Sequence, residues 1–380
     1  MAGGTAEVSH PRVRLLLLAF LGLALCAIAT SALYMSSGAQ SVGYFKAHDE
    51  TETRSLLPPL SELPPETPLV YIGIFVEKVY ELSLVSRTFS ADGYIWLEWP
   101  AEVDRLMREE SISPLELVRM PNRVEIWDSL FEATSEEPIE LSAGRFYQRY
   151  RFSSRFYDDD ILLHRDPFDS LSLPIVIEIG PLSMSQKYAG VTLIPHHQAN
   201  GFIGLSGSIS GYRLETAMLT PLLHHYPSRF GSWYRPTLSQ ARLNIVYRAD
   251  YWSAFLNWIF PLLIIMAIVL LAPSVAGSLG DVRIAIPSTA LLSLIFLQQS
   301  YHDELPALPY LTFLDKLFSI SFAICLGLFA LFTWGTTIFD QAAEPERPRI
   351  AARINQIDTI FQTSCFIIFM IVALVAWNGS

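Results

Sequence analysis

The sequence predicts an integral membrane protein, in which an extracytoplasmic antiparallel β-sandwich is followed by a four-helix transmembrane bundle. Three observations predict this fold class. Long apolar runs gather in the last third of the chain, short alternating apolar runs fill its middle, and a basic then apolar segment stands at its start. Hydrophobic residues make up 51% of the 380 residues and charged ones 17%, a balance too apolar for an ordinary soluble protein of this length.

Five apolar runs approach or exceed the roughly 20 residues with which a helix crosses a bilayer. They are Leu15 to Tyr34, Trp252 to Ala272, Ile284 to Leu297, Leu311 to Phe339 and Ile360 to Trp377. Because Arg12 and Arg14 precede the first run, residues 1–35 are predicted to be either a cleaved signal peptide or a retained membrane anchor. The other four runs define a transmembrane domain over residues 251–380.

Basic residues predict how the chain crosses the membrane. Arg283 begins the third run and Arg347, Arg349 and Arg353 lie between the fourth and fifth, whereas the loop from Ser300 to Tyr310 has no Lys or Arg. Since basic loops remain on the cytoplasmic side, we expect a multi-pass protein of the cell (inner) membrane. Its sandwich domain is then extracellular or periplasmic.

The middle of the chain divides into two parts. Residues 36–67 are polar and Pro-rich, which indicates a linker. Residues 68–250 contain short β-rich runs with turn signals between them, and these predict the sandwich. The runs are Val70 to Val76, Tyr94 to Trp99, Phe146 to Phe152, Leu173 to Ile179, Phe202 to Ile209 and Ala241 to Arg248, and helical periodicity is confined to about Ala101 to Arg108.

The third long run carries a stripe of residues at helical spacing, with an acid at each end. Its members are Asp281, Ala285, Thr289, Leu292, Phe296, Gln299 and Asp303, which steps of three or four place on one helix face. Carboxylates in hydrocarbon are costly unless they meet water or a partner. The stripe is therefore either the wall of a water-filled pore or part of a helix buried among others, with its ends in the headgroups.

Charge and motifs exclude other classes. The net charge of −11 argues against a nucleic-acid partner and would attract cations. Cys26, Cys325 and Cys365 all fall in apolar runs, so the sandwich is expected to have no disulfide and no thiolate metal site. The segment from Gly204 to Ser208 misses the nucleophile-elbow pattern, and we expect no catalytic residue, metal or cofactor.

Three segments resemble the pentameric ligand-gated ion channels, the Cys-loop receptor superfamily. They are Thr88 to Trp99 (TFSADGYIWLEW), Asp166 to Leu173 (DPFDSLSL), and Leu305 to Thr312 (LPALPYLT) with Asp315 after it. The middle segment resembles the signature loop, and its lack of cysteines matches the bacterial branch. The sequence departs from the family at Asp166, Leu171 and Pro287, and the spacing from Arg248 to Pro261 is one residue longer than expected.

The resemblance implies a homopentamer in the lipid bilayer that conducts inorganic cations. The seven stripe residues would line the pore, with Asp281 and Asp303 as acidic rings and Leu292 and Phe296 as an apolar constriction. Arg283, which lies off the stripe, is expected to turn toward the headgroups or Asp281.

The same resemblance implies sites for a small-molecule or proton ligand and for its coupling to the pore. The ligand residues would be Phe75, Tyr94, Tyr226, Phe230, Trp233 and Tyr234, with Leu182 where an aromatic ring is expected. The coupling residues would be Pro167, Phe168, Asp169, Arg248, Pro306 and Pro309, with an Arg–Asp pair at the membrane boundary. The alternative is a non-conducting membrane sensor with the same fold, and an enzyme is disfavoured.

Overall fold

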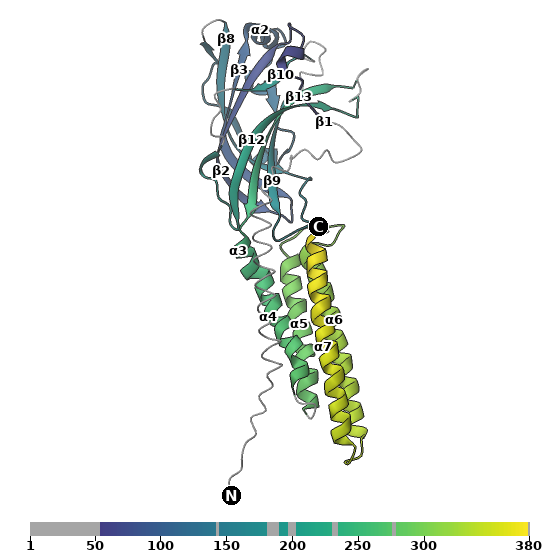
Figure 1. Ribbon diagram of the computed structural model, residues 1–380. Coiled ribbons are helices and arrows are strands. Elements are labelled where there is room, and N and C mark those ends of the chain that lie inside the picture. Colours follow the sequence, from purple (N-terminus) through teal and green to yellow (C-terminus); the bar gives the residue numbers. More distant parts are fainter. Residues whose placement is uncertain are drawn as a thin grey trace. The chain divides into compact units, whose positions relative to one another are not determined.

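The computed structural model of this chain describes residues 54–141, 144–180, 190–196, 203–229, 235–275 and 279–378. Two β-sheets come first in the sequence and four long helices follow (Figure 1). The sheets and helices belong to one compact unit, Thr53–Ser380. The signal peptide or membrane anchor predicted at residues 1–35 lies outside the described part of the chain, as does most of the predicted linker.

The smaller sheet has five strands in the order β1-β12-β13-β9-β4, and all its pairs are antiparallel. Its strands are β1 (Arg54–Leu56), β12 (Tyr212–His225), β13 (Thr237–Ala249), β9 (Ser170–Ile179) and β4 (Val118–Arg119). β1 lies within residues 36–67, so the end of the predicted linker pairs with the edge of this sheet.

The larger sheet has eight strands and contains both parallel and antiparallel pairs. This corrects the prediction of a purely antiparallel sandwich. Its main path is β10 (Thr192–Pro195), β2 (Leu69–Ser83), β3 (Thr88–Pro100), β8 (Arg145–Tyr157) and β5 (Arg123–Val124). β6 (Leu130–Ala133) and β7 (Ile139–Leu141) also pair with β8, and β11 (Ile203–Ser206) with β2. β10 and β11 run parallel to β2. No hairpin joins either of them to β2, so turn geometry does not impose the antiparallel direction.

The hydrophobic core lies between the two sheets and follows from period-two alternation. Val70, Ile72, Ile74 and Val76 of β2 are fully buried, because alternate residues of a strand face the same side. Leu173, Ile175 and Ile177 of β9 belong to the same core cluster. The predicted strands at residues 94–99, 146–152, 173–179 and 241–248 are confirmed, and the predicted helix is α2 (Ala101–Glu109).

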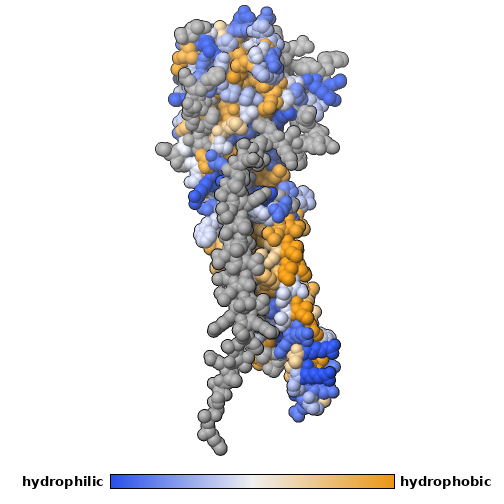
Figure 2. All heavy atoms as spheres, viewed as in Figure 1, coloured by the Kyte–Doolittle hydropathy of each residue, from blue (hydrophilic) through white to orange (hydrophobic). Residues whose placement is uncertain are grey.

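Four helices of the described chain are long and apolar enough to cross a membrane. They are Tyr251–Ser274, which comprises α3 (Tyr251–Ala254), a π-helical segment (Phe255–Ile259), α4 (Phe260–Leu271) and a 3-10 turn; α5 (Gly280–His302); α6 (Phe313–Gln341); and α7 (Arg347–Asn378). In Figure 2, hydrophobic residues cover much of the middle of the visible helices, and hydrophilic residues gather at their lower end. The π-helical segment matches the extra residue between Arg248 and Pro261, since a π-turn absorbs one inserted residue.

Close packing of β2 against β3 generates a first prediction. A Cβ at Gly93 would lie 2.2 Å from the backbone oxygen of Phe75, so Gly93→Ala has to push the paired strands apart. We expect a loss of on the order of 1–3 kcal/mol in the free energy of unfolding, measured as a lower melting temperature of the purified full chain. Gly190→Ala is the control, because a Cβ there meets no atom within 4 Å. Equal melting temperatures for the two variants would contradict the prediction.

Candidate functional site: an exposed helical stripe and the boundary with the sandwich

The seven stripe residues of α5 are all exposed in the single chain. Asp281, Ala285, Thr289, Leu292, Phe296, Gln299 and Asp303 share this property. The opposite side of α5 is buried, through Arg283, Pro287, Ala290, Leu294 and Tyr301. Since α5 packs against α4 and α6, one face is satisfied within the chain. The stripe lies on the other face and stays exposed.

The stripe combines polar ends with an apolar middle. Leu292 and Phe296 are 53% and 63% exposed. The Thr289 hydroxyl donates to the carbonyl of Ala285 at 2.9 Å, and the Gln299 amide donates to Asp303 at 2.8 Å. These bonds satisfy part of the polar groups within the helix itself, so the stripe can face either water or another protein surface.

Arg283 does not bind where the sequence suggested. It turns away from the stripe, as expected, but its partner is Asp358 of α7 and not Asp281 or the headgroups. The guanidinium carbon also lies 4.3 Å from the centre of the Phe332 ring on α6. The prediction failed because the fifth apolar run starts at Ile360, whereas the helix itself begins at Arg347 and carries Asp358 into the bundle.

The loop before β9 contacts the start and end of the helical part. The Phe168 ring lies 6.1 Å from Tyr251, 6.2 Å from Phe313 and 5.7 Å from Trp377, measured between ring centres. One residue of this loop, His164, stacks on Tyr310 at 3.9 Å, and its carbonyl accepts a hydrogen bond from the amide of Phe313. The segment that joins α5 to α6 is therefore held directly by a sandwich loop.

The predicted Arg–Asp pair at this boundary is wrong. The Arg248 guanidinium lies over the Tyr251 ring at 5.7 Å, and no ion pair joins it to Asp169 within the described residues. Asp169 instead accepts a hydrogen bond from the amide of Arg165 at 2.6 Å. Pro167 lines a pocket at this boundary, and Pro306 and Pro309 lie between Leu305 and Tyr310. Leu305 and Leu308 pack against the sandwich core.

A chain of hydrogen bonds lies at the boundary beneath this loop. Tyr301 at the end of α5 donates to the Thr312 hydroxyl at 2.9 Å, and that hydroxyl donates to Asp315 at 2.9 Å. Asp315 also binds His302 at 2.7 Å. These bonds join the end of α5 to the start of α6, and Asp166 of the sandwich loop lines the same pocket as Tyr301.

Asp166, in the loop before β9, has a pKa that is shifted to near neutrality. Asp166 is 5% exposed, and its pKa is raised to about 7, mainly by burial. The nearby acids Asp169, Glu304 and Asp315 contribute to this rise, while the nearby Tyr301 hydroxyl opposes it.

An open pocket of about 840 Å³ lies against the same residues. Its lining includes three acids, Glu81, Asp166 and Glu304, and contains no Lys, Arg or His. The rings of Tyr212, Trp258 and Tyr301 also line it. Carboxylates together with aromatic faces favour a cation over an anion.

The predicted ligand residues are only partly described. Phe75 and Tyr94 are paired across β2 and β3, and the Arg149 guanidinium lies 5.3 Å from the Tyr94 ring. Tyr226 directly follows β12 in the other sheet, so a single chain does not bring these three rings together in one sheet. Leu182, Phe230, Trp233 and Tyr234 lie outside the described residues.

Tyr226 belongs to a buried polar cluster that the sequence did not reveal. Glu178 is fully buried and accepts hydrogen bonds from Arg119 at 2.5 Å, Tyr226 at 2.9 Å and Gln240 at 2.5 Å, with His224 at 3.0 Å. Burial would raise the pKa of Glu178, but the bonds from His224, Gln240 and Arg119 outweigh it and hold the pKa below its ordinary value. Strand register makes these residues neighbours, which spacing alone does not show.

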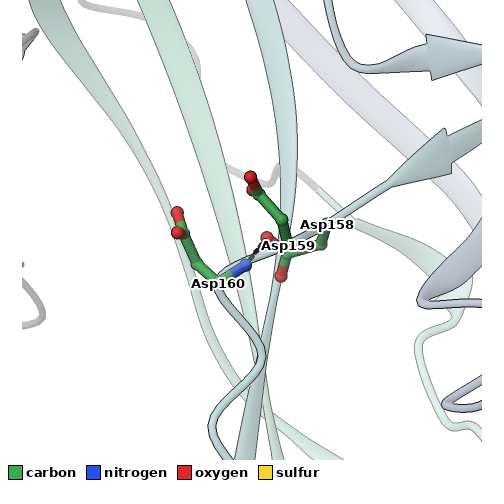
Figure 3. A group of neighbouring side chains, drawn as sticks. All are labelled: Asp158, Asp159 and Asp160. Atoms are coloured by element: carbon green, nitrogen blue, oxygen red, sulfur yellow. Dashed lines mark hydrogen bonds between the residues drawn. The ribbon is translucent and has the colours of Figure 1, made fainter. Parts of the chain in front are cut away.

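Three consecutive acids, Asp158 to Asp160, form the one metal-compatible group among the described residues (Figure 3). Asp158 is buried, and burial raises its pKa to about 6, while Asp159 and Asp160 are exposed. Arg54 and Arg242 approach Asp160 at 3.9 Å and 3.6 Å. These two guanidinium groups already offset much of the acid charge that a metal ion would need.

Comparison with known proteins adds no relative. The sequence matches no protein-family model, and no curated protein is significantly similar to it.

The burial of Asp166 generates a second prediction. Its pKa rises from 3.8 to about 7 in the fold, so the stability it contributes is full below pH 4 and is lost as the pH rises through about 7. Asp166→Asn stays neutral and should escape this loss. The melting temperature of the purified variant, relative to that of the wild type, should therefore rise between pH 5 and 8. The upper limit is on the order of 4 kcal/mol, since each pKa unit corresponds to about 1.4 kcal/mol.

The matched control is Asp159→Asn, an exposed acid in the strand-to-loop segment before Asp166. Its melting temperature should follow the wild type at every pH. A constant difference between wild type and Asp166→Asn across this range would contradict the raised pKa.

Proposed function

We propose that this chain is the subunit of a homopentameric, cation-selective ligand-gated ion channel of the bacterial cell (inner) membrane. One observation carries the proposal. The stripe on α5 is exposed along its whole length in the single chain, while the opposite face is buried. Copies arranged around an axis would enclose this stripe and leave water against its polar members.

The chemistry of the stripe supports conduction. In a ring of copies, Leu292 and Phe296 form an apolar constriction, from which water withdraws when the radius is small. Thr289 and Gln299 keep the flanking sections wet. Asp281 and Asp303 place carboxylates at the two mouths, which favours cations, and the net charge of −11 adds to the attraction.

The boundary contacts support gating by the sandwich domain, on the extracellular or periplasmic side. Phe168 packs against Tyr251, Phe313 and Trp377, so movement of its loop changes the packing of three helices together. Asp166, whose pKa is raised to about 7, lines the same pocket as Tyr301 at the end of α5. Such a boundary has two arrangements that a ligand can bias.

Two kinds of ligand fit this arrangement. A small organic cation suits the aromatic and acidic lining of the 840 Å³ pocket, or the rings of Phe75 and Tyr94 beside Tyr226 of a neighbouring subunit. Protons suit Asp166.

Two measurements test the proposal as a whole. The mass of the intact detergent-solubilised assembly should equal five chains. Single-channel recording in lipid bilayers, over a screen of amines and pH, should give unitary cation currents. Five chains without current under any condition would favour the non-conducting sensor, and a monomer would exclude the pentameric channel.

The apolar constriction generates a third prediction. Leu292→Thr places a hydroxyl in the driest part of the conduit, which stabilises water there and should increase the open probability several-fold. Leu291→Thr makes the same chemical change one position off the stripe and should have a smaller effect. The measurement is the open probability of single channels at a fixed ligand concentration. An equal or greater effect of Leu291→Thr would remove Leu292 from the gate.

The acidic ends of the stripe generate a fourth prediction. The double variant Asp281→Asn and Asp303→Asn removes the charges that attract cations, so its reversal potential in a salt gradient should move toward zero. Asp340→Asn neutralises an exposed acid at the end of α6, off the stripe, and serves as the control. An unaltered reversal potential in the double variant would take both acids out of ion selection.

A further inference from the structure

Arg283 is the only Lys or Arg in α5, and it stands close to the acid that would begin the conduit. It is two positions after Asp281 and two before Ala285, both of which are exposed on the stripe. Its own side chain is 4% exposed. A positive charge therefore lies at the level of the first acidic ring but is kept on the other side of the helix.

Two groups hold the guanidinium of Arg283 there. One is the carboxylate of Asp358, whose side chain is 2% exposed, and the other is the face of the Phe332 ring at 4.3 Å. The Nε atom of Arg283 has no hydrogen-bond partner among the described residues, so Asp358 supplies the ionic contact. The pair is buried, and removing one partner of a buried pair leaves an uncompensated charge that costs several kcal/mol.

Asp358 is itself fixed in place. One helical turn further along α7, Gln362 donates a hydrogen bond to the carbonyl of Leu270 in α4 at 2.5 Å. α7 is thus attached at this level to α4 through Gln362 and to α5 through Asp358. The carboxylate has a fixed position toward which Arg283 turns.

We propose that Asp358 determines the ion selectivity of the channel by position: it holds Arg283 against α6 and α7 and so leaves Asp281 unopposed at its mouth of the conduit. This inference rests on the proposed channel function. Asp358 does not touch the permeant ion and acts only through Arg283.

The consequence of losing Asp358 follows from the energy of an unpaired charge. A guanidinium without a partner in an apolar bundle moves toward water, and its long side chain allows it to do so. The nearest water is at the mouth of the conduit, beside Asp281. Each subunit would then contribute one positive and one negative charge there, in place of one negative charge.

The experiment compares the reversal potentials of full-length channels in lipid bilayers under a potassium chloride gradient. Asp358→Asn should lose cation preference, with a reversal potential near zero or of opposite sign. The double variant Arg283→Gln with Asp358→Asn removes the freed charge together with its partner and should regain the cation preference of the wild type. Asp340→Asn should match the wild type throughout.

Two results would overturn the inference. One is an Asp358→Asn channel that conducts with the reversal potential of the wild type, which would leave the pair with a structural role only. The other is a double variant that keeps the altered selectivity, because Arg283 would then not be the agent. A wild type that passes no current would instead contradict the channel function itself.

A variant that fails to assemble does not end the test. Asp358→Asn subunits can be co-expressed with wild-type subunits that carry a different affinity tag, and mixed channels purified through both tags. Their reversal potential should shift in proportion to the fraction of variant subunits. An unchanged value in mixed channels would overturn the inference as well.

Discussion

The structure depends on the fact that α5 satisfies only one of its two faces within its own chain. Packing against α4 and α6 buries Ala290 and Leu294, and the pair of Arg283 with Asp358 extends that attachment to α7. The stripe from Asp281 to Asp303 remains open. Because carboxylates cannot face hydrocarbon without cost, the open face needs water, other copies, or both. The channel proposal is the arrangement that supplies both at once.

The boundary between sandwich and helices is held by a few contacts. Aromatic packing joins Phe168 to three helices, and the stack of His164 on Tyr310 holds the connection between α5 and α6. The hydrogen bond from Tyr301 to Thr312 joins the end of α5 to the start of α6. Asp166, whose pKa is raised to about 7, lines the same pocket as Tyr301.

Features with local periodicity could be predicted from the sequence, and features set by distant pairing could not. The membrane-length helices, most strands and the exposure of the stripe follow from spacing within one element. Asp358 was missed because it is 75 residues from Arg283 and precedes the apolar run. The Glu178 cluster depends on the register of four strands, and the parallel pairing of β10 and β11 depends on how the chain crosses between sheets. The Arg248–Asp169 pair was predicted from resemblance alone. The guanidinium of Arg248 instead lies over the Tyr251 ring.

The π-helical turn at Phe255–Ile259 sets the rotation of α4, which follows it, about the helix axis. An additional residue in one turn rotates the following helix by about 100° relative to an uninterrupted α-helix. In the observed phase the indole of Trp258 meets the edge of the Tyr301 ring, 5.3 Å between centres. Shortening this turn by one residue would swing α4 about its own axis and carry the indole off the end of α5. The length of a single helical turn therefore decides which side of the first helix touches Tyr301 at the end of α5.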